Sequence, residues 1–241
     1  FFVLGVMAVL AAALLTLGGC GSTTSDSSGA KGKSMVVGVN LFSTTLDPHK
    51  DYDGWFVVRY GLGETLARVS DKMTLEPWLA TKWEMLDATT WKITLRDGVK
   101  FHTGAPMTAE AVKASIERAF AKNKRAETFF KYKEIKADGQ NLIITTEKPE
   151  PNMPGFLAAP LFLIVDTTAE GERDFAKQGP ICTGPYVCES FTKEKAVMKK
   201  NPHYWDGEVP YETVEIPSID DPNTRAMALQ SGEVDMAVNI G

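Results

Sequence analysis

The N-terminal segment constrains this chain more than any other part of its sequence. Residues 1–17 form an uncharged apolar run, which Gly18, Gly19 and then Cys20 follow. Residues 21–34 (GSTTSDSSGAKGKS) are small and polar, a composition typical of a flexible tether. The apolar run is short for a bilayer-spanning helix and has little flanking charge on its far side, which argues against a membrane-spanning helix. We therefore expect the folded part to begin after residue 34; the alternative is a membrane anchor helix with an incidental cysteine.

The sequence Leu17-Gly18-Gly19-Cys20 resembles a bacterial lipobox, in which the cysteine is acylated and becomes the first residue of the mature chain. The resemblance predicts a lipoprotein signal peptide over residues 1–19 and lipidation at Cys20. Two acyl groups give stable anchoring where one does not, so the domain is expected at the extracytoplasmic face of the cell membrane. The first residue is Phe1, with no Met and no Lys/Arg stretch before the apolar run, so we expect the N-terminus to be incomplete.

Charge and composition exclude several classes of protein. The net charge is −5, and acidic and basic residues are interspersed. A nucleic-acid binder would be expected to carry a clustered cationic face, so no nucleic-acid partner is predicted. No second long apolar run follows the first, so no other membrane crossing is expected. An apolar content of 44% is sufficient for the core of one large domain or two small ones, and we expect a monomer.

Two cysteines remain besides Cys20. Cys182 and Cys188 flank the segment 183–187, and an extracytoplasmic location would permit a disulfide between them. An extended segment of this length would hold the two Cα atoms too far apart, so only a tight reversal at Gly184-Pro185 could join them. The alternative is that both are small buried hydrophobic residues.

Strands and helices alternate along the rest of the sequence, which predicts an α/β or α+β domain. Hydrophobic periodicity, capping residues and turn signals define the segments. We expect strands at 35–39, 90–95, 141–147, 161–165, 187–191, 196–200 and 234–238, and helices at 55–69, 108–120, 168–177 and 222–230, the last capped by Asp221.

The sequence shows no sign of catalytic machinery. The histidines lie apart and in no spacing typical of zinc sites, and neither a nucleophile elbow nor a phosphate-binding glycine loop is present. His49 lies among three acidic residues, Asp47, Asp51 and Asp53, which could ligate a metal, but such a cluster is more typical of a solvated acidic turn. We therefore predict no catalytic residues, no metal ligands and no cofactor, and an enzyme is the weaker hypothesis.

Aromatic side chains are the better candidates for a functional site. Tyr52 and Trp55 follow the turn at residues 47–49. Most such residues belong to a core, but Tyr and Trp beside a turn also suit a concave ligand site. We predict that both contact a ligand, with core packing the alternative for Trp55.

Several segments, in this order, together resemble one family. They are LGETL (62–66), LEPWLATKWE (75–84), WKITLRDGVKFH (91–102), GAPMTAEAV (104–112), TGPY (183–186), NPHYW (201–205) and PNTRAMAL (222–229) with SGEVD (231–235). The ordered set resembles the peptide/nickel class of solute-binding proteins of ABC importers, and the likeness extends from residue 36 to residue 241. The DGVKF hairpin and the 222–230 helix identify the fold without contacting ligand.

The resemblance implies a type II periplasmic-binding-protein-like fold with two lobes and an inserted subdomain, closing on its ligand like a hinged trap. It implies a first lobe at 35–45 and 166–241 and an insertion at 46–165. Members are about twice as long, so we expect an N-terminal fragment without the second lobe. Because a hinged receptor encloses its ligand between two lobes, we expect this part alone to bind weakly.

The resemblance also implies the function and partners: an extracytoplasmic receptor that captures oligopeptides for ABC permease subunits. A nickel or metallophore complex is the alternative, and a secreted lipoprotein enzyme or a structural lipoprotein without ligand is less favoured. Nickel-binding relatives present arginine near the segment matching 159–164, which is wholly apolar in this sequence, so oligopeptides are the first choice. Cys182 departs from the glycine that usually precedes Thr-Gly-Pro.

Overall fold

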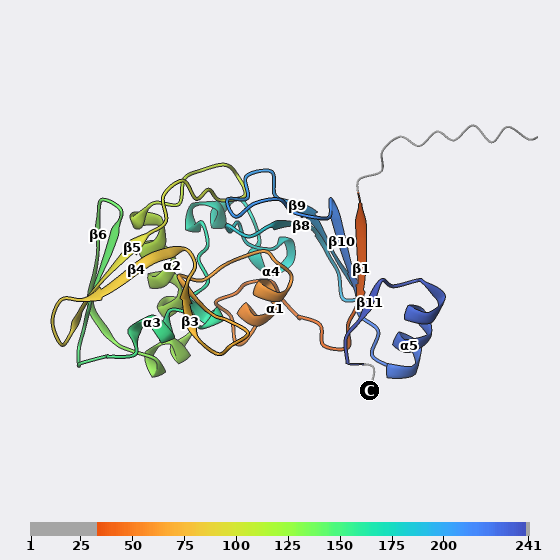
Figure 1. Ribbon diagram of the computed structural model, residues 1–241, viewed down its shortest axis with the longest axis horizontal. Helices are drawn as coiled ribbons and strands as arrows, with labels where there is room; N and C mark the ends of the chain where they lie inside the picture. The colour runs from red at the N-terminus through yellow and green to blue at the C-terminus, as the bar shows by residue number, and fades with distance from the viewer. Residues whose placement is uncertain (1–32, 240–241) are drawn as a thin grey trace, which may run out of the picture. The chain divides into compact units, whose positions relative to one another are not determined.

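A computed structural model describes residues 33–239 (Figure 1). The predicted signal peptide, Cys20 and nearly all of the tether lie outside the described residues. The strands are β1 (Ser34–Gly38), β2 (Ala67–Val69), β3 (Leu75–Pro77), β4 (Ala80–Met85), β5 (Thr90–Leu95), β6 (Tyr132–Asp138), β7 (Asn141–Thr146), β8 (Tyr186–Phe191), β9 (Lys195–Lys200), β10 (Thr213–Pro217) and β11 (Met236–Ala237). The α-helices are α1 (Gly54–Arg59), α2 (Ala109–Lys122), α3 (Met153–Phe156), α4 (Phe175–Gln178) and α5 (Pro222–Ser231), with 3-10 helices η1 (Lys124–Thr128), η2 (Pro160–Phe162) and η3 (Thr167–Gly171).

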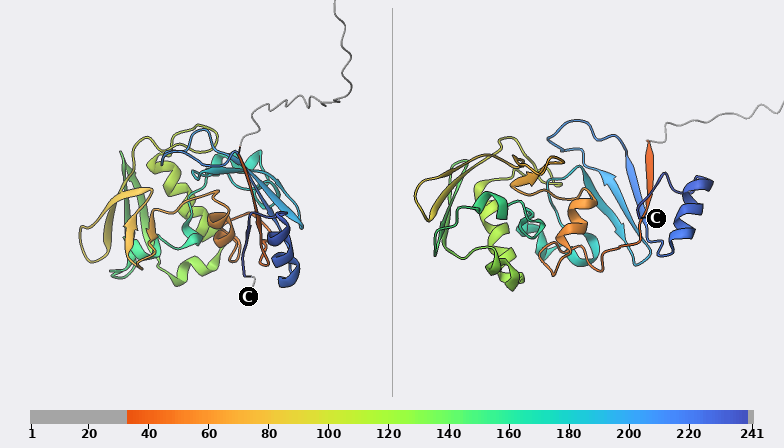
Figure 2. Two further views of the ribbon diagram at one scale, coloured as in Figure 1. Left: turned by 45° about the vertical axis from the view of Figure 1, so that its right-hand side comes forward. Right: turned by 60° about the horizontal axis from the view of Figure 1, so that its bottom comes forward.

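The larger sheet has five strands in the order β11-β1-β10-β9-β8. β1 pairs in parallel with both β10 and β11, whereas β8, β9 and β10 are antiparallel neighbours. The parallel pairs join distant parts of the chain, because Val36 lies opposite Glu215 and Val37 opposite Met236. Helices α1 and α5 lie on opposite sides of this sheet (Figure 2).

A second sheet is antiparallel, with four strands in the order β4-β5-β7-β6, and β2 and β3 form a separate two-stranded sheet. Alternate residues of β5, beginning with Trp91, are buried, and α2 packs on this face with Val112 and Ile116 fully buried. Helix α2 begins where its capping residue predicts: the Thr108 hydroxyl accepts a hydrogen bond from the Ala111 backbone N–H at 3.2 Å. The strands and helices together confirm the predicted α/β class.

Two groups of buried apolar side chains form separate cores. One fills the space between the four-stranded sheet and α2, and the other lies against the five-stranded sheet. The segment 162–165 separates them, because Phe162 and Ile164 belong to the first core and Leu163 and Val165 to the second. Residues from Leu46 to Leu62 contribute to the second core, so the loop after β1 and helix α1 pack with the larger sheet.

Most of the expected elements form, three differ in type or continuity, and the strand expected over 234–238 is confined to Met236–Ala237. The helix predicted over 55–69 ends at Arg59, because Gly61 has a φ of +69° and the chain turns there, leaving Leu62 and Leu66 buried outside any helix. The strand predicted over 161–165 is instead η2 followed by extended chain, although its residues are buried as expected.

The helix predicted over 168–177 divides into η3 and α4. The division falls at Asp174, whose carboxylate accepts a hydrogen bond from the Ala176 backbone N–H and begins a new helix. Helix α5 is confirmed with its Asp221 cap, which accepts a hydrogen bond from the Thr224 N–H at 2.7 Å.

Cys182 and Cys188 are both free and buried, which confirms the alternative of two small hydrophobic residues. Strand β8, which contains Cys188, continues the chain away from Cys182 without the tight reversal that a disulfide would need. Over residues 33–239, no helix has the length and apolar character needed to cross a bilayer.

Candidate ligand-binding site

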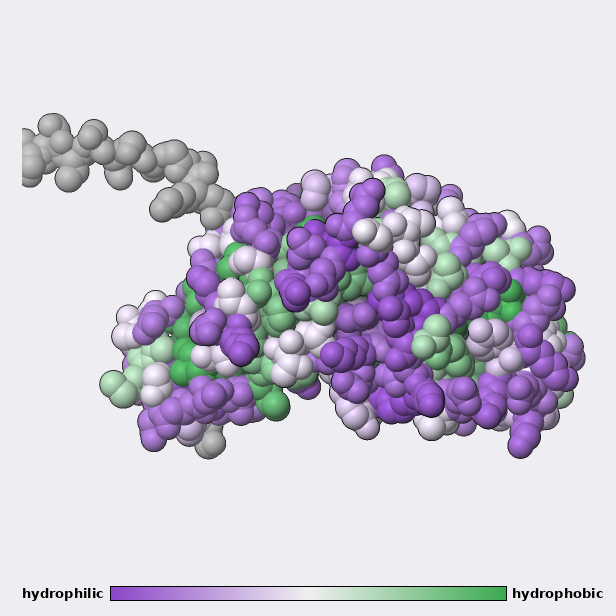
Figure 3. Space-filling view, turned by 180° about the vertical axis from the view of Figure 1, so that it is seen from behind, coloured by the Kyte–Doolittle hydropathy of each residue, from purple (hydrophilic) through white to green (hydrophobic). Residues whose placement is uncertain are grey.

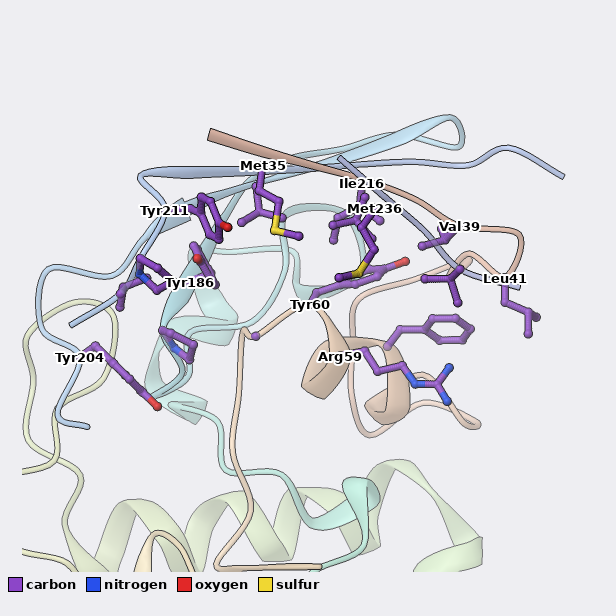
Figure 4. A pocket seen from close by; sticks show the side chains of 18 of the residues that line it. Met35, Val39, Leu41, Arg59, Tyr60, Tyr186, Tyr204, Tyr211, Ile216 and Met236 are labelled. Carbon is purple, nitrogen blue, oxygen red and sulfur yellow. The ribbon is translucent and has the colours of Figure 1, made fainter. Parts of the chain in front are cut away.

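A pocket of about 720 Å³ opens between the five-stranded sheet, helix α1 and the segment 204–211 (Figure 4). Its wall is mostly apolar, and Figure 3 shows apolar surface gathered over the part of the molecule that carries this sheet. The lining residues that matter most are Met35, Val37 and Val39 from β1 and its end, Val214 and Ile216 from β10, Met236 and Val238 at β11, Phe56, Arg59 and Tyr60 at α1, and Tyr186, Tyr204 and Tyr211.

The sheet side of the pocket follows from strand geometry. Successive side chains of a strand point to opposite faces, so Met35, Val37 and Val39 share one face of β1. The opposite face is packed, because a Cβ added at Gly38 would meet Ile219 and Val234 at 3.4 Å. The pocket is therefore the apolar face of the sheet that α5 leaves uncovered.

The opposite side of the pocket comes from α1. The ring of Tyr60 lies between Phe56 and Phe42, at centroid distances of 6.2 and 6.0 Å. Burial raises the pKa of Tyr60 to about 12, so its hydroxyl stays protonated. In Figure 4, Met35 and Met236 extend from the strands toward Tyr60. These thioether and aromatic groups make a deformable apolar surface.

Arg59 is the cationic group of this pocket. In the part of the chain that the structure describes, no carboxylate lies within 4.0 Å of its guanidinium. A cation without a carboxylate partner at the edge of an apolar pocket is suited to an anionic group of a ligand.

Tyr52 and Trp55, the residues predicted to contact ligand, lie at the N-terminal end of α1 with 62% and 51% of their surface exposed. Neither is among the residues that line the pocket. The guanidinium of Arg125 stacks over the Tyr52 ring, 4.0 Å from its centroid. Asn123 brings the two segments together by donating a hydrogen bond to the Asp51 carbonyl at 3.0 Å.

Arg125 was not anticipated from the sequence, where it is one basic residue in a Lys-rich stretch. Its Nε is buried without a hydrogen-bond partner, and none of the carboxylates described lies within 4.0 Å of its guanidinium. Only the folding of η1 against the 51–53 turn brings Arg125 over Tyr52, and neither residue lines the pocket.

The acidic turn around His49 is only partly solvated, which corrects the expectation: Asp51 is exposed, whereas His49 and Asp53 are buried. His49 is fully buried, and its Nε2 lies 3.0 Å from the Leu163 carbonyl. Arg118 of α2 donates two hydrogen bonds of 2.8 Å to Asp47 and two more to Glu170, and it contacts the His49 Nδ1 at 3.0 Å. Across residues 33–239, no group of three potential metal ligands is found.

The charges of this Arg118 cluster (Asp47, His49, Arg118 and Glu170) are mutually dependent. Burial and the nearby Arg118 charge lower the pKa of His49 to about 4, so the imidazole is neutral. Hydrogen bonds from Arg118 lower the pKa of Glu170 to about 2, and they lower that of Asp47 despite its burial. The cluster ties α2 to the loop after β1, which makes it structural.

Comparison with known proteins identifies the class to which this architecture corresponds. Residues 74–241 match the family of bacterial extracellular solute-binding proteins, family 5 (middle region). The chain is 29% identical over 235 residues to the nickel-binding protein NikA of Staphylococcus aureus, covering 97% of this chain and 46% of NikA. It is 32% identical to the glutathione-binding protein GsiB of Salmonella typhi over 86% of this chain and 42% of GsiB.

Solved structures agree with the sequence comparisons. A nickel ABC transporter protein from Bacillus halodurans superposes with a TM-score of 0.79 at 40% identity, over 85% of this chain and 42% of that protein. S. aureus NikA in complex with Ni(L-His)2 superposes with a TM-score of 0.78 at 28% identity, over 84% and 43% of the two chains. The chain thus spans less than half the length of these relatives.

Proposed function

This chain belongs to the bacterial extracellular solute-binding proteins of family 5, and from that premise we propose that it acts in the extracytoplasmic receptor of an ABC importer. The receptor captures a small solute and delivers it to the permease subunits, without catalysis. The observation that carries the proposal is the pocket of about 720 Å³ on the uncovered face of the larger sheet. Pockets for small ligands are typically concave, largely apolar and of roughly 300–1,000 Å³, with a few polar groups that orient the ligand.

The proposed ligand is a nickel ion carried in a complex with a small carboxylate-bearing chelator. Similarity to the nickel-binding proteins of S. aureus and B. halodurans supports this choice. The described residues offer no group of three ligands for a bare ion, so the protein would contact the chelator and not the metal. The apolar pocket wall suits the organic part of such a complex, and Arg59 in the lining suits a carboxylate of the chelator.

Oligopeptides, the first choice from the sequence, are the second candidate, supported by the likeness to GsiB. The sequence argument against nickel was the apolar character of residues 159–164. Leu161, Leu163 and Ile164 are buried core residues, so core packing explains why they are apolar. The apolar character of this segment therefore does not discriminate between nickel complexes and peptides.

We also propose the anchoring and the lobe division that the sequence predicts. Cys20 carries the lipid anchor, and the receptor works as a monomer. Segments 35–45 and 166–241 belong to the first lobe and 46–165 to the insertion, with one refinement. Residues 46–62 are better assigned to the first lobe, because their buried side chains pack in the core of the larger sheet.

Titration calorimetry on the full-length protein tests the ligand. The solutes are Ni(II) with L-histidine, Ni(II) alone, glutathione and a panel of tripeptides and tetrapeptides. We expect binding of the nickel–histidine complex and none of free Ni(II). Binding of peptides alone would transfer the function to the second candidate. Turnover of any solute, or silence with all of them, would contradict the receptor proposal.

A matched pair of variants tests the anionic contact. Arg59→Gln is expected to weaken binding of the nickel–histidine complex about tenfold, or about 1.4 kcal/mol, because it removes from the pocket lining a cation with no carboxylate partner within 4.0 Å in the described chain. Lys131→Gln is the control, since Lys131 lies outside the lining and pairs with Glu127 at 3.2 Å. Equal effects of the two substitutions would remove Arg59 from the site.

The contribution of a second lobe is tested by comparing residues 1–241 with the full-length protein on the same solute. We expect a loss of more than tenfold, or about 1.4 kcal/mol, because half a cleft leaves one side of the ligand in water. Affinities within tenfold of each other would contradict the two-lobe proposal.

A further inference from the structure

One wall of the pocket is a segment without regular structure. Residues 201–211, called the rim segment below, contain neither helix nor strand, yet they contribute residues between Tyr204 and Tyr211 to the pocket. A loop that shapes a pocket needs contacts that fix its position, because it lacks the hydrogen-bond ladder of a strand. Two side chains of the rim segment, those of Tyr204 and Trp205, donate to one carboxylate, that of Glu64.

Glu64 is fully buried and accepts three side-chain hydrogen bonds. Its Oε2 accepts from the Trp205 Nε1 at 2.9 Å and from the Thr183 hydroxyl at 2.7 Å, and its Oε1 accepts from the Tyr204 hydroxyl at 3.2 Å. Within the described chain, no Lys, Arg or His nitrogen lies within 4.0 Å of this carboxylate. Two of its three donors belong to the rim segment.

A second set of contacts holds the start of the rim segment but carries no charge. The Asn201 side chain donates to the Gly184 carbonyl at 2.8 Å, and the Asn201 backbone N–H donates to the Pro185 carbonyl at the same distance. Gly184 packs against the chain at Gly61, where an added Cβ would lie 2.5 Å from the Gly61 carbonyl oxygen. Glu64, the 183–185 segment and the rim segment thus form one assembly behind the pocket, in which the Glu64 carboxylate is the ionisable hydrogen-bond acceptor.

We propose that Glu64 is a positioning residue for the pocket, a buried carboxylate that fixes the rim segment through Tyr204 and Trp205 and whose ionisation loosens that segment. The proposal rests on the proposed function only in taking the pocket as the ligand site. The geometry of the Glu64 contacts is independent of which ligand is bound.

The direction of the effect follows from the buried charge. Burial raises the pKa of Glu64 from its ordinary 4.5 to about 7, and the hydrogen bonds from Trp205, Thr183 and Tyr204 offset only part of this shift. If opening of the rim hydrates the carboxylate, its pKa falls back toward the ordinary value. Protonated Glu64 therefore favours the closed rim, and ionised Glu64 favours the open one.

The charged and titratable residues near the assembly are His203, Asp206 and Glu208 on the rim segment, Cys182 beside Thr183, His102 against Cys182, Arg68, whose charge acts on Tyr204, and Arg96 over the Trp205 ring. His203 is exposed on the rim segment itself, so His203→Gln, which should retain the pH dependence, is a required control. Burial holds the pKa of His102 at about 3 and that of Cys182 well above its ordinary value. Neither group titrates near neutral pH.

Hydrogen–deuterium exchange of the purified, ligand-free protein tests the proposal. Exchange of rim amides, corrected for the intrinsic base-catalysed rate, is expected to accelerate on the order of 50-fold between pH 5 and pH 8, as the raised pKa requires if opening hydrates Glu64. Amides of β5 and β7 should show no comparable acceleration. Because no ligand is present, a failure of this test is distinct from a failure to bind nickel complexes or peptides.

Three variants make the test specific. Glu64→Gln should abolish the pH dependence of rim exchange, whereas Glu212→Gln, an exposed carboxylate paired with Lys200, should retain it. Trp205→Phe removes one donor but keeps the carboxylate, so the acceleration should move to higher pH, and this variant serves if Glu64→Gln does not fold. An unchanged dependence in Glu64→Gln, or equal acceleration in β5 and β7, would overturn the proposal.

Discussion

Two carboxylate clusters, one partly exposed and one fully buried, connect distant segments of this protein by different chemistry. In the Arg118 cluster, the carboxylates of Asp47 and Glu170 share one guanidinium, which lowers the pKa of both. Glu64 instead meets three neutral donors and no cation among the described residues, and burial raises its pKa to about 7. A paired cation thus lowers the pKa of a carboxylate despite its burial, whereas neutral donors offset only part of the rise in pKa that burial causes.

The largest expected effect comes from breaking the paired cluster. Arg118→Met should lower the free energy of unfolding by roughly 3–5 kcal/mol, because it leaves Asp47 and His49 buried without the cation that compensates them. Urea denaturation at pH 7 measures the loss. Lys113→Met on the same helix is the control, since its exposed pair with Glu117 contributes about 0.3–0.5 kcal/mol. Similar losses in both variants would show that the Arg118 cluster behaves as a surface pair.

The second prediction uses pH to separate the two clusters. Glu64 binds its proton more tightly in the folded state, so stability should fall as pH rises from about 4.5 to about 7, by on the order of 3 kcal/mol at most. Glu64→Gln should remove this decline. Glu170 has the opposite sign: its contribution is present above its ordinary pKa and is lost as pH falls toward about 2. If Glu64→Gln also removed the loss of stability at low pH that is assigned to Glu170, the two clusters would not titrate independently.

A third, smaller effect is expected at Thr183, which donates to Glu64. Thr183→Val should cost about 1.5–3 kcal/mol at pH 8, where the hydrogen bond has a charged acceptor, and less at pH 5. Thermal or urea unfolding at both pH values measures the difference. Thr183→Ser keeps the hydroxyl and should lose less at pH 8. A cost independent of pH would mean that packing of the methyl group dominates.

The smallest expected effect concerns Asp206, whose negative charge raises the pKa of Glu64. Asp206→Asn should shift the midpoint of the pH-dependent decline to lower pH, while stability at pH 5 changes by no more than about 0.5 kcal/mol, as for most exposed positions. A shift to higher pH would indicate that another group controls the titration of Glu64.

Local signals predicted the elements that local physics controls. Thr108 and Asp221 cap their helices as expected, and the alternation at Trp91, Ile93 and Leu95 predicts β5 to the residue. The helix expected over 55–69 fails for a nonlocal reason. Leu62 and Leu66 have helical spacing, but they enter two different cores, and a chain turning at Gly61 satisfies both.

The candidate site was only partly predictable. Tyr52 and Trp55 lie on or beside α1, the helix that supplies Phe56, Arg59 and Tyr60 to the pocket, but they remain predicted ligand contacts outside its lining. The sheet face of the pocket could not be predicted from the sequence. Strands β1 and β11 come from opposite ends of the described chain, and no local sequence signal indicates that they pair.

By itself, the sequence determined the class of chain: an α/β domain with capped helices, alternating strands and the ordered motifs of its family, all set by spacing over a few residues. Only the tertiary structure decided which side chains meet. Arg125 stacks over Tyr52, Arg118 forms an ion pair with Asp47, and Trp205 donates a hydrogen bond to Glu64. The partners in each pair lie far apart in the sequence. The physical reason is that burial and charge pairing depend on the whole fold, whereas turns, caps and alternation depend on neighbouring residues.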